Sequence, residues 1–361
     1  MVPFICMGVS FKTLVVRFSS VGDIVLSTPL LRVLRAKFPS GQIDYVTRTE
    51  YAELVKNNQN LNLVHEFDAR EGFQGLRSLK RKLKKERYDL VLDIHGSLRS
   101  RFLRTGLGAK DVLGIDKRKH ERFMLVKFKQ NLYKEIVPVA DRYIEPLHAF
   151  GVKPDGKGTE LHIPDEILFG VSGKIATLQL NRFEKTIGLC PSSRHMTKRW
   201  PWERFADLAV RLIREHEAKI LLFGGPEDRA LSTQIVEVIT KETGAERVTD
   251  FSGQFSLLET AAAMEFCDAV VSNDSGLMHI AAAMNKKLIA IFGSTVREFG
   301  FFPLGQDTRV VERSGLSCRP CSHIGLPDCP EGHFRCMKDI AVDEVVASVQ
   351  SLLGRTIVQQ K

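Results

Sequence analysis

Short apolar runs alternate with longer stretches of apolar residues at helical spacing along the chain. In the first half, "KTLVVRF" (12–18), "QIDYVT" (42–47) and "YDLVLDI" (88–94) predict strands. Between the first two, "GDIVLSTPLLRVLRAKFP" (22–39) predicts one helix that stops at Pro39. Strands that alternate with helices predict a parallel sheet with helical crossovers.

The second half repeats this rhythm. Buried strands are predicted at "KTIGLC" (185–190), "AKILLFG" (218–224), "DAVVSN" (268–273) and "KLIAIFG" (287–293). Helical stretches such as "PWERFADLAVRLIREH" and "LLETAAAMEFC" separate them, and "DEVVASVQSLL" (343–353) predicts a closing helix. The pattern therefore indicates two α/β domains, each with its own parallel sheet.

A Gly- and Pro-rich stretch interrupts the pattern at "GVKPDGKGTELHIPDE" (151–166). A chain of 361 residues is also too long for one ordinary core. We therefore expect a first domain at 1–175, a second domain at 176–340 and a closing helical segment at 341–361.

Composition places the chain among globular proteins, with 43% hydrophobic and 26% charged residues. The start lacks a basic region and a cleavage site, no apolar run is long enough to span a bilayer, and the seven cysteines suit a reducing compartment. A cytoplasmic protein is the expectation.

Residues 1–180 carry 30 Lys and Arg against 20 Asp and Glu, whereas the remainder carries 22 against 23. The basic first half predicts an anionic partner, which composition leaves open among nucleic acid, lipid and a phosphorylated small molecule.

In open α/β sheets, ligands bind beyond the carboxyl ends of the strands. The first strand ends in "RFSSVGDIV" (17–25), where Ser20 and Gly22 precede Asp23 in a first helical turn. Two interpretations of a carboxylate at this position are open. It stabilises the helix dipole, or it acts as a general base that accepts a proton from an attacking hydroxyl.

Two of the turns that join a strand to the next helix, called corners below, suit a nucleotide in the second half of the chain. In "GLCPSSRHMTKRWPWERF" (188–205), Ser192, Ser193 and Lys198 suit phosphate oxygens, and a polar loop with a Ser cap is the alternative. In "LLFGGPEDRA" (221–230), the paired glycines admit a ligand and Glu227 can hydrogen-bond a ribose or base. A plain turn explains that corner equally well.

The most specific corner is "SNDSGLMHI" (272–280), between a strand and a helix. Asp274 or Ser275 is expected to cap the helix that starts near Gly276. The backbone N–H groups of Gly276, Leu277 and Met278 are then left to bind an anion, best a diphosphate. His279 follows one turn later. It is either a structural residue or a donor to a phosphate.

Absent motifs narrow the chemistry. The chain has no G-x-G-x-x-G, no G-x-x-x-x-G-K-[ST] and no Asp-x-Asp. These absences disfavour a dinucleotide dehydrogenase, P-loop chemistry and metal-dependent sugar transfer. We therefore expect no cofactor, and expect Lys198 and the helix N-terminus to neutralise a diphosphate leaving group.

Three stretches together resemble glycosyltransferase family 9, the bacterial ADP-heptose:lipopolysaccharide heptosyltransferases. They are "RFSSVGDIVLSTPLLRVLRAKFP", "YDLVLDIHGSLRS" and "SNDSGLMHIAAAMNKKLIAIFGST". The resemblance runs from about residue 12 to 350 and implies a GT-B fold, in which two Rossmann-like domains with parallel sheets face each other. It also implies inverting, metal-independent transfer of heptose from ADP-heptose, with the acceptor on the first domain and the donor on the second.

The resemblance carries over residue by residue. Asp23 matches the proposed catalytic base of the family, and Glu227 matches an acidic position near the nucleoside. Ser192, Ser193 and Lys198 match its diphosphate loop, although the family often has Thr there and some members have one residue fewer before the lysine. The main donor corner of the family is matched by Asp274, Ser275, Gly276, Leu277 and His279.

The acceptor implied by the resemblance is the inner core of lipopolysaccharide, which is anionic. The segment "LRSLKRKLKKER" (76–87) holds seven basic residues and one acidic residue. It is either a solvated helix face or a contact with anionic glycolipid or the inner-membrane surface. The second basic segment, "GIDKRKHERF" (114–123), is expected to line the acceptor site. The acceptor candidates are Ser20, Gly22, Arg70, Lys117, Arg118 and Arg122.

Four cysteines gather late in the chain, in "CRPCSHIGLPDCPEGHFRC" (318–336). Cys318, Cys321, Cys329 and Cys336, with two nearby histidines, have the chemistry to bind zinc, but their spacing matches no common zinc finger. Similar loops occur in relatives without an evident catalytic role. No metal is therefore assigned to the site.

The sequence thus predicts a cytoplasmic heptosyltransferase that uses ADP-heptose at the inner face of the inner membrane. One alternative is a transferase of the same fold that uses another nucleotide sugar. A second is a binding protein for an anionic ligand. Nucleic acid is disfavoured as a partner because no stacking aromatic motif accompanies the basic segments.

Overall fold

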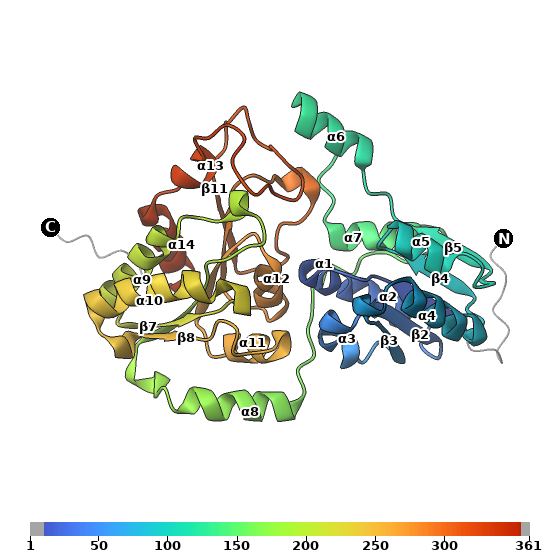
Figure 1. The fold of residues 1–361 in the computed structure, drawn as a ribbon, viewed down its shortest axis with the longest axis horizontal. Helices are drawn as coiled ribbons and strands as arrows, with labels where there is room; N and C mark the ends of the chain where they lie inside the picture. Colours follow the sequence, from blue (N-terminus) through green and yellow to red (C-terminus); the bar gives the residue numbers. More distant parts are fainter. Residues whose placement is uncertain (1–10, 355–361) are drawn as a thin grey trace. The chain divides into compact units, whose positions relative to one another are not determined.

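The computed structural model describes residues 11–354, which form two compact units (Figure 1). The first unit runs as far as Lys117 and also includes Val139–His162. The second unit holds Arg118–Pro138 and continues from Ile163. Residue 175, where the sequence analysis placed a domain boundary, lies in α8 (Asp165–Ala176) of the second unit. Each unit contains its own sheet.

The first unit contains a five-stranded parallel sheet in the order β3-β2-β1-β4-β5. Its strands are β1 (Lys12–Val16), β2 (Gln42–Arg48), β3 (Leu63–Phe67), β4 (Leu90–Asp93) and β5 (Asp111–Gly114). The three predicted strands are confirmed as β1, β2 and β4. The central β1 is buried because helices cover both faces of the sheet, as its apolar sequence requires.

Helices of the first unit pack in two layers. They are α1 (Val21–Val25), α2 (Thr28–Lys37), α3 (Glu53–Lys56), α4 (Gly72–Glu86), α5 (Leu98–Arg104) and α7 (Val139–Ile144). On one face, Leu76, Leu79 and Leu83 of α4 join Leu103 of α5 in a core with Val16 and its neighbours. On the other side, α2 contacts α7.

The single helix predicted for residues 22–39 was wrong in one respect, because it is broken into α1 and α2. Ser27 occupies the cap position of α2, and Pro29 lies in the first turn of that helix. Proline has no N–H group and its ring clashes with the carbonyl four residues earlier, so the helix has to restart. The predicted stop before Pro39 is confirmed.

The second unit contains a six-stranded parallel sheet in the order β11-β10-β9-β6-β7-β8. Its strands are β6 (Lys185–Cys190), β7 (Ala218–Leu222), β8 (Val248–Asp250), β9 (Ala269–Asn273), β10 (Leu288–Phe292) and β11 (Thr308–Glu312). The four predicted strands are confirmed as β6, β7, β9 and β10, and all four are buried nearly throughout.

The second unit has eight α-helices among the described residues. They are α6 (Lys119–Phe128), α8, α9 (Trp202–His216), α10 (Arg229–Thr243), α11 (Leu257–Met264), α12 (Gly276–Ala283), α13 (Arg335–Lys338) and α14 (Val342–Leu353). One core joins α9, α10 and α14 to the sheet. Elsewhere in the unit, α11 contacts α8 and α12. The predicted closing helix is confirmed as α14. Within residues 11–354, no helix is long and apolar enough to cross a bilayer.

Each sheet reverses its direction of growth once. The first sheet grows from β1 through β2 to β3, and the chain then returns to place β4 on the other side of β1. The second sheet grows from β6 through β7 to β8 and then returns to place β9 beside β6. Loops diverge at such a switch point, so the carboxyl ends of β1 with β4, and of β6 with β9, are the natural ligand positions.

Candidate active site

Asp23 lies at the switch point of the first unit, in the first turn of α1. Its Oδ1 lies 2.6 Å from Nη2 of Arg17 and accepts a hydrogen bond of 3.0 Å from the Tyr143 hydroxyl. Its Oδ2 accepts from the Ser20 hydroxyl at 2.9 Å and from the Ser20 N–H at 3.3 Å. The carboxylate is thus held from three directions, which fixes its orientation.

These contacts decide the charge of Asp23. Burial by itself would raise the pKa of Asp23, but Arg17, both donors of Ser20 and the Tyr143 hydroxyl hold that pKa below its ordinary value of 3.8. Asp23 is therefore ionised at neutral pH. Arg17 is itself buried and also donates to the backbone oxygens of Ser19 and Ile94.

His95 lies across the same switch point, directly after β4. The buried Asp93 carboxylate accepts from the His95 N–H at 3.1 Å and from the Gly96 N–H at 2.7 Å, which shapes the turn. Burial lowers the pKa of His95 to about 4, and the nearby cations Arg17 and Lys117 contribute to that shift. Its imidazole is therefore neutral at neutral pH, and its buried Nδ1 has no hydrogen-bond partner in residues 11–354.

The acceptor candidates are divided between separate places. Ser20 and Gly22 belong to the Asp23 corner, and Lys117 Nζ lies 3.4 Å from the Gly96 oxygen in the same unit. Arg70 follows the edge strand β3, where its side chain is exposed and pairs with Asp68 at 2.6 Å. Arg118 and Arg122 belong to the second unit, at the start of α6. The basic segment 114–123 is thus split between the two units.

In the second unit, the donor candidates follow three adjacent strands, β7, β6 and β9. Lys198 Nζ lies 2.7 Å from Oδ2 of Asp274, and the Thr295 hydroxyl donates to the same oxygen at 2.7 Å. The Ser193 hydroxyl donates to the backbone oxygen of Asp274 at 2.9 Å. The fold therefore brings the loop after β6 and the corner after β9 together.

Asn273 fixes these two segments to each other. Its amide donates to the Pro191 oxygen at 2.7 Å, and its Oδ1 accepts from the Trp200 N–H at 3.0 Å. This buried side chain thereby spans the whole loop that carries Ser192, Ser193 and Lys198. Its position at the end of a predicted strand was visible in the sequence, but its partners were not.

The third corner, after β7, is connected to the loop after β6 through Ser192. Its hydroxyl donates to the Asp228 carboxylate, which also accepts from the Gly225 N–H at 2.9 Å. Glu227 is exposed on the short turn Pro226–Asp228. The carboxylate of Glu227 folds back over Gly225, where a Cβ would meet its Oε2 at 2.5 Å. Because the exposed Glu227 side chain is free to swing aside, this contact alone does not require glycine at position 225.

Helix α12 begins at Gly276, as predicted, with Ser275 in the cap position. The expected side-chain cap was wrong, because Ser275 makes no capping hydrogen bond and the Asp274 carboxylate is turned toward Lys198 and Thr295. Gly276 and Leu277 form the first turn, where backbone N–H groups lack helical partners. His279 is buried in the following turn.

The Cys-rich stretch 318–336 braces the loop that carries Lys198. The Thr197 N–H donates to the Leu326 oxygen at 3.2 Å, and the Leu326 N–H donates to the Thr197 hydroxyl at 2.8 Å. The Ser294 hydroxyl also donates to that of Thr197, at 3.1 Å. The sequence did not predict this contact, because the two segments that form it are more than a hundred residues apart in the chain.

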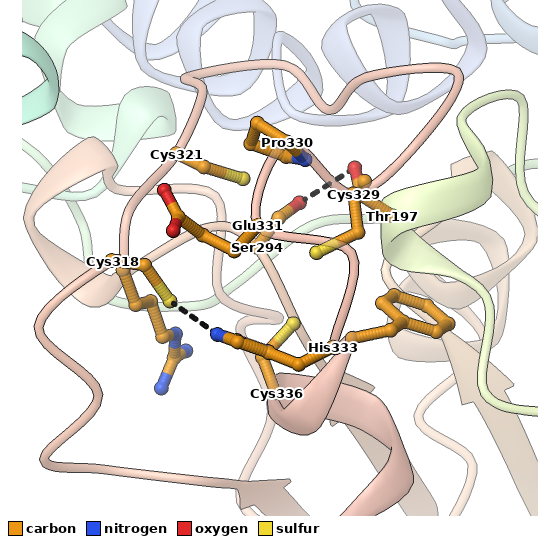
Figure 2. A pocket seen from close by; sticks show the side chains of 11 residues that line it. Thr197, Ser294, Cys318, Cys321, Cys329, Pro330, Glu331, His333 and Cys336 are labelled. Atoms are coloured by element: carbon orange, nitrogen blue, oxygen red, sulfur yellow. Dashed lines mark hydrogen bonds between the residues drawn. The ribbon is translucent and has the colours of Figure 1, made fainter.

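Figure 2 shows the four late cysteines and His333 around one pocket, together with Thr197 and Ser294. Cys318 Sγ lies 3.8 Å from Nε2 of His333. Burial raises the pKa of the Cys336 thiol to about 12, so it is protonated at neutral pH. Among residues 11–354, no three His, Cys, Asp or Glu side chains are placed to hold a metal ion.

Comparison with solved structures defines the class. The crystal structure of the glycosyl transferase family 9 protein from Veillonella parvula has a TM-score of 0.80 at 24% identity and covers 97% of this chain and 99% of its own. The structure of Escherichia coli ADP-heptose lps heptosyltransferase II has a TM-score of 0.73 at 25% identity, over 95% and 98% of the two chains. The two parallel sheets are those of a GT-B glycosyltransferase.

The sequence comparisons give the family. The model of glycosyltransferase family 9 (heptosyltransferase) matches residues 76–328, more than half of the chain. Lipopolysaccharide heptosyltransferase 2 of Escherichia coli K12 is 28% identical over 356 residues, which cover 95% of this chain and 98% of that protein. The chain belongs to glycosyltransferase family 9, and the predicted family, fold and enzyme class are confirmed.

Proposed function

We propose that this enzyme transfers heptose from ADP-heptose to the inner core of lipopolysaccharide, with inversion at the anomeric carbon and without a metal ion. The observation that carries the proposal is the corner at the β6 and β9 switch point, where Lys198 lies beside the first turn of α12. An ammonium group and free backbone N–H groups together suit a diphosphate. The two Escherichia coli relatives named above are heptosyltransferases, and one of them is an ADP-heptose lps heptosyltransferase.

Asp274 acts as a positioning residue in this proposal. Its carboxylate is nearly inaccessible and already engaged by Lys198 and Thr295, so it holds the ammonium in place instead of binding the donor. The donor phosphates then meet Lys198, the Gly276 and Leu277 N–H groups and the hydroxyls of the loop after β6. As the sugar leaves, these groups stabilise the negative charge that develops on ADP.

Asp23 is the proposed base. An acceptor hydroxyl attacks the anomeric carbon, the bond from that carbon to the diphosphate oxygen breaks, and the hydroxyl proton passes to the Asp23 carboxylate. Because the pKa of Asp23 is held below 3.8, the carboxylate is a weak base that stays ionised at neutral pH. It therefore accepts the proton late, when the attacking oxygen already carries positive charge.

The anionic acceptor fits the basic surface of the first unit. Exposed Arg77, Arg81 and Lys84 follow one face of α4, and the neighbouring α5 adds exposed Arg99 and Arg101. We assign this face to contact with the anionic glycolipid or with the inner-membrane surface, at the cytoplasmic side. Opposite charges at such a surface also raise the rate of encounter.

Replacement of Asp23 tests the proposed chemistry. Asp23→Asn should lower kcat by about a hundredfold or more, because the proton acceptor is lost. Binding of ADP-heptose should stay nearly unchanged, since the donor contacts lie in the second unit. The measurement is ADP release with a heptose-deficient core acceptor, together with the anomeric configuration of the product by NMR.

The matched control is Asp111→Asn, an exposed carboxylate on the edge strand β5. The Asp23→Asn substitution would leave Arg17 buried without its ion pair, at a cost of about 3–5 kcal/mol, so a thermal melt must show a folded protein. Turnover of folded D23N at the level of D111N would refute Asp23 as the base. A retained anomeric configuration would refute the single inverting step.

A further inference from the structure

The segment of residues 118–136 exposes aromatic side chains that the proposed transfer does not use. Phe123 is 57% exposed and Phe128 is 55% exposed, and their rings meet edge to face with centroids 5.7 Å apart. Adjacent exposed apolar side chains of this size mark a surface that a partner covers. Neither side chain was singled out by the sequence pattern.

Helix α6 presents these rings with lysines beside them. Lys119, Phe123 and Lys127 follow one another at a spacing of four residues, so they share one helix face. Leu125, on the opposite face, is buried. A short helix with aromatic and basic side chains together on its outer face is typical of one that lies in a membrane interface.

The other side of the segment is fixed to its own unit. Lys129 Nζ donates to the backbone oxygens of Cys318 at 3.0 Å and Pro320 at 2.6 Å. The Asn131 amide donates to Oε1 of Glu298 at 2.9 Å. These contacts hold the segment in place with its aromatic face outward, so little conformational entropy is lost when that face is covered.

Charge selects the partner. Residues 118–136 hold six Lys and Arg against two Glu. Past the helix, the same segment also exposes Leu132, by 43%, and Ile136, by 55%. The phosphate backbone of a nucleic acid would satisfy the cations alone, whereas an anionic bilayer offers phosphates to the cations and acyl chains to the apolar side chains.

We propose that residues 118–136 dock on a bilayer of anionic phospholipid. Phe123 and Phe128 enter the boundary between headgroups and acyl chains, and Lys119 and Lys127 meet the phosphates. The inference rests on the proposed function in one respect, because a lipid-linked acceptor is what brings the enzyme to a bilayer.

Vesicle sedimentation of the full chain tests this surface. The wild-type protein should sediment with vesicles of phosphatidylethanolamine and phosphatidylglycerol and much less with phosphatidylcholine alone. The double variant F123S/F128S should lower the partition coefficient about tenfold or more, because the buried apolar area is lost. K119Q/K127Q should weaken only the binding that depends on the anionic lipid. The matched control is F169S on α8, where the phenylalanine is 75% exposed and lies near Asp165 and Glu166.

The outcomes separate this surface from the transfer reaction. F128S/I136S, whose two side chains lie outside the segment 114–123 expected at the acceptor site, should keep the wild-type rate with a deacylated, water-soluble core oligosaccharide and lose rate only with vesicle-borne acceptor. Absence of transfer by the wild type, with vesicle binding intact, would refute the proposed function alone. Equal sedimentation of F123S/F128S and F169S would overturn the lipid surface. Dimers of the wild type that F123S/F128S abolishes in sedimentation velocity would overturn it as well, since a second copy would then cover the face.

Discussion

At the residue scale, Asp23 combines the two roles that the sequence left open, a carboxylate at a helix N-terminus and a proposed general base. Asp23 accepts from the Ser20 N–H and so closes the first turn of α1, which is a structural role. It is also bound by Arg17 and Tyr143, which no helix cap requires. These two partners lower the pKa of Asp23 and aim its carboxylate, so they set the behaviour of the proposed base.

Loss of the Tyr143 hydroxyl should raise the pKa of Asp23. Tyr143→Phe removes a donor that favours the ionised carboxylate, so the acid limb of kcat/KM should move upward by about one pH unit. Wild-type activity should show its acid limb below pH 3.8. The measurement is kcat/KM against pH for both proteins.

Tyr45→Phe is the control for this substitution. Tyr45 is equally buried in the same unit, but its hydroxyl bonds Ser27 at 2.9 Å and not the carboxylate. If the acid limb moved as far in Y45F as in Y143F, or did not move in Y143F, the pH dependence of kcat/KM would not be set by the pKa of Asp23.

At the element scale, the loop after β6 owes its shape to distant segments. Asn273 fixes it to the end of β9, and Leu326 fixes it to the Cys-rich stretch. Thr197, at the centre of the second contact, directly precedes Lys198. The position of the ammonium therefore depends on a stretch that carries no group for the reaction.

Thr197→Val should weaken donor binding, although Thr197 is not one of the residues proposed to contact the donor. The substitution keeps the side-chain shape but leaves the Leu326 N–H and the Ser294 hydroxyl without a partner, at about 1–3 kcal/mol of stability. We expect the Kd for ADP-heptose to rise about tenfold as Lys198 loses its fixed position. Calorimetry and a thermal melt measure the two effects.

Thr260→Val provides the comparison, since Thr260 is a buried threonine of α11 that bonds the Ser256 oxygen at 2.8 Å. It should lose stability and keep its affinity. If both variants bound the donor equally well, the brace would have no part in positioning Lys198.

The strands that the sequence failed to predict are β3, β5, β8 and β11, the four edge strands of the two sheets. An edge strand is covered less than a central one, so it needs no continuous apolar run. Asp111–Gly114 is mostly exposed, and Thr308–Glu312 alternates irregularly. The central strands were predictable because burial on both faces demands an unbroken apolar sequence.

At the scale of the whole molecule, the sequence predicted the positions of the site better than its contacts. The strand ends at the two switch points carry recognisable polar clusters, so the sequence predicted where Asp23, Lys198 and the start of α12 lie, whereas their roles in the reaction stay predictions. Tyr143 was not, because 120 residues separate it from Asp23 and only the packing of α7 brings it near. The predicted cap of α12 by Asp274 or Ser275 was wrong, since Lys198 and Thr295 from other loops engage the Asp274 carboxylate and Ser275 makes no capping hydrogen bond.

The central claim is that the second unit binds ADP-heptose at the α12 corner without a metal ion. Calorimetric titration of the purified protein, in buffer with a chelator, tests it most directly, with UDP-glucose and GDP-mannose as controls. We expect ADP-heptose alone to bind, and Lys198→Ala to weaken its binding by about tenfold or more. Preference for another nucleotide sugar, or binding that needs added metal or ignores Lys198→Ala, would contradict the account.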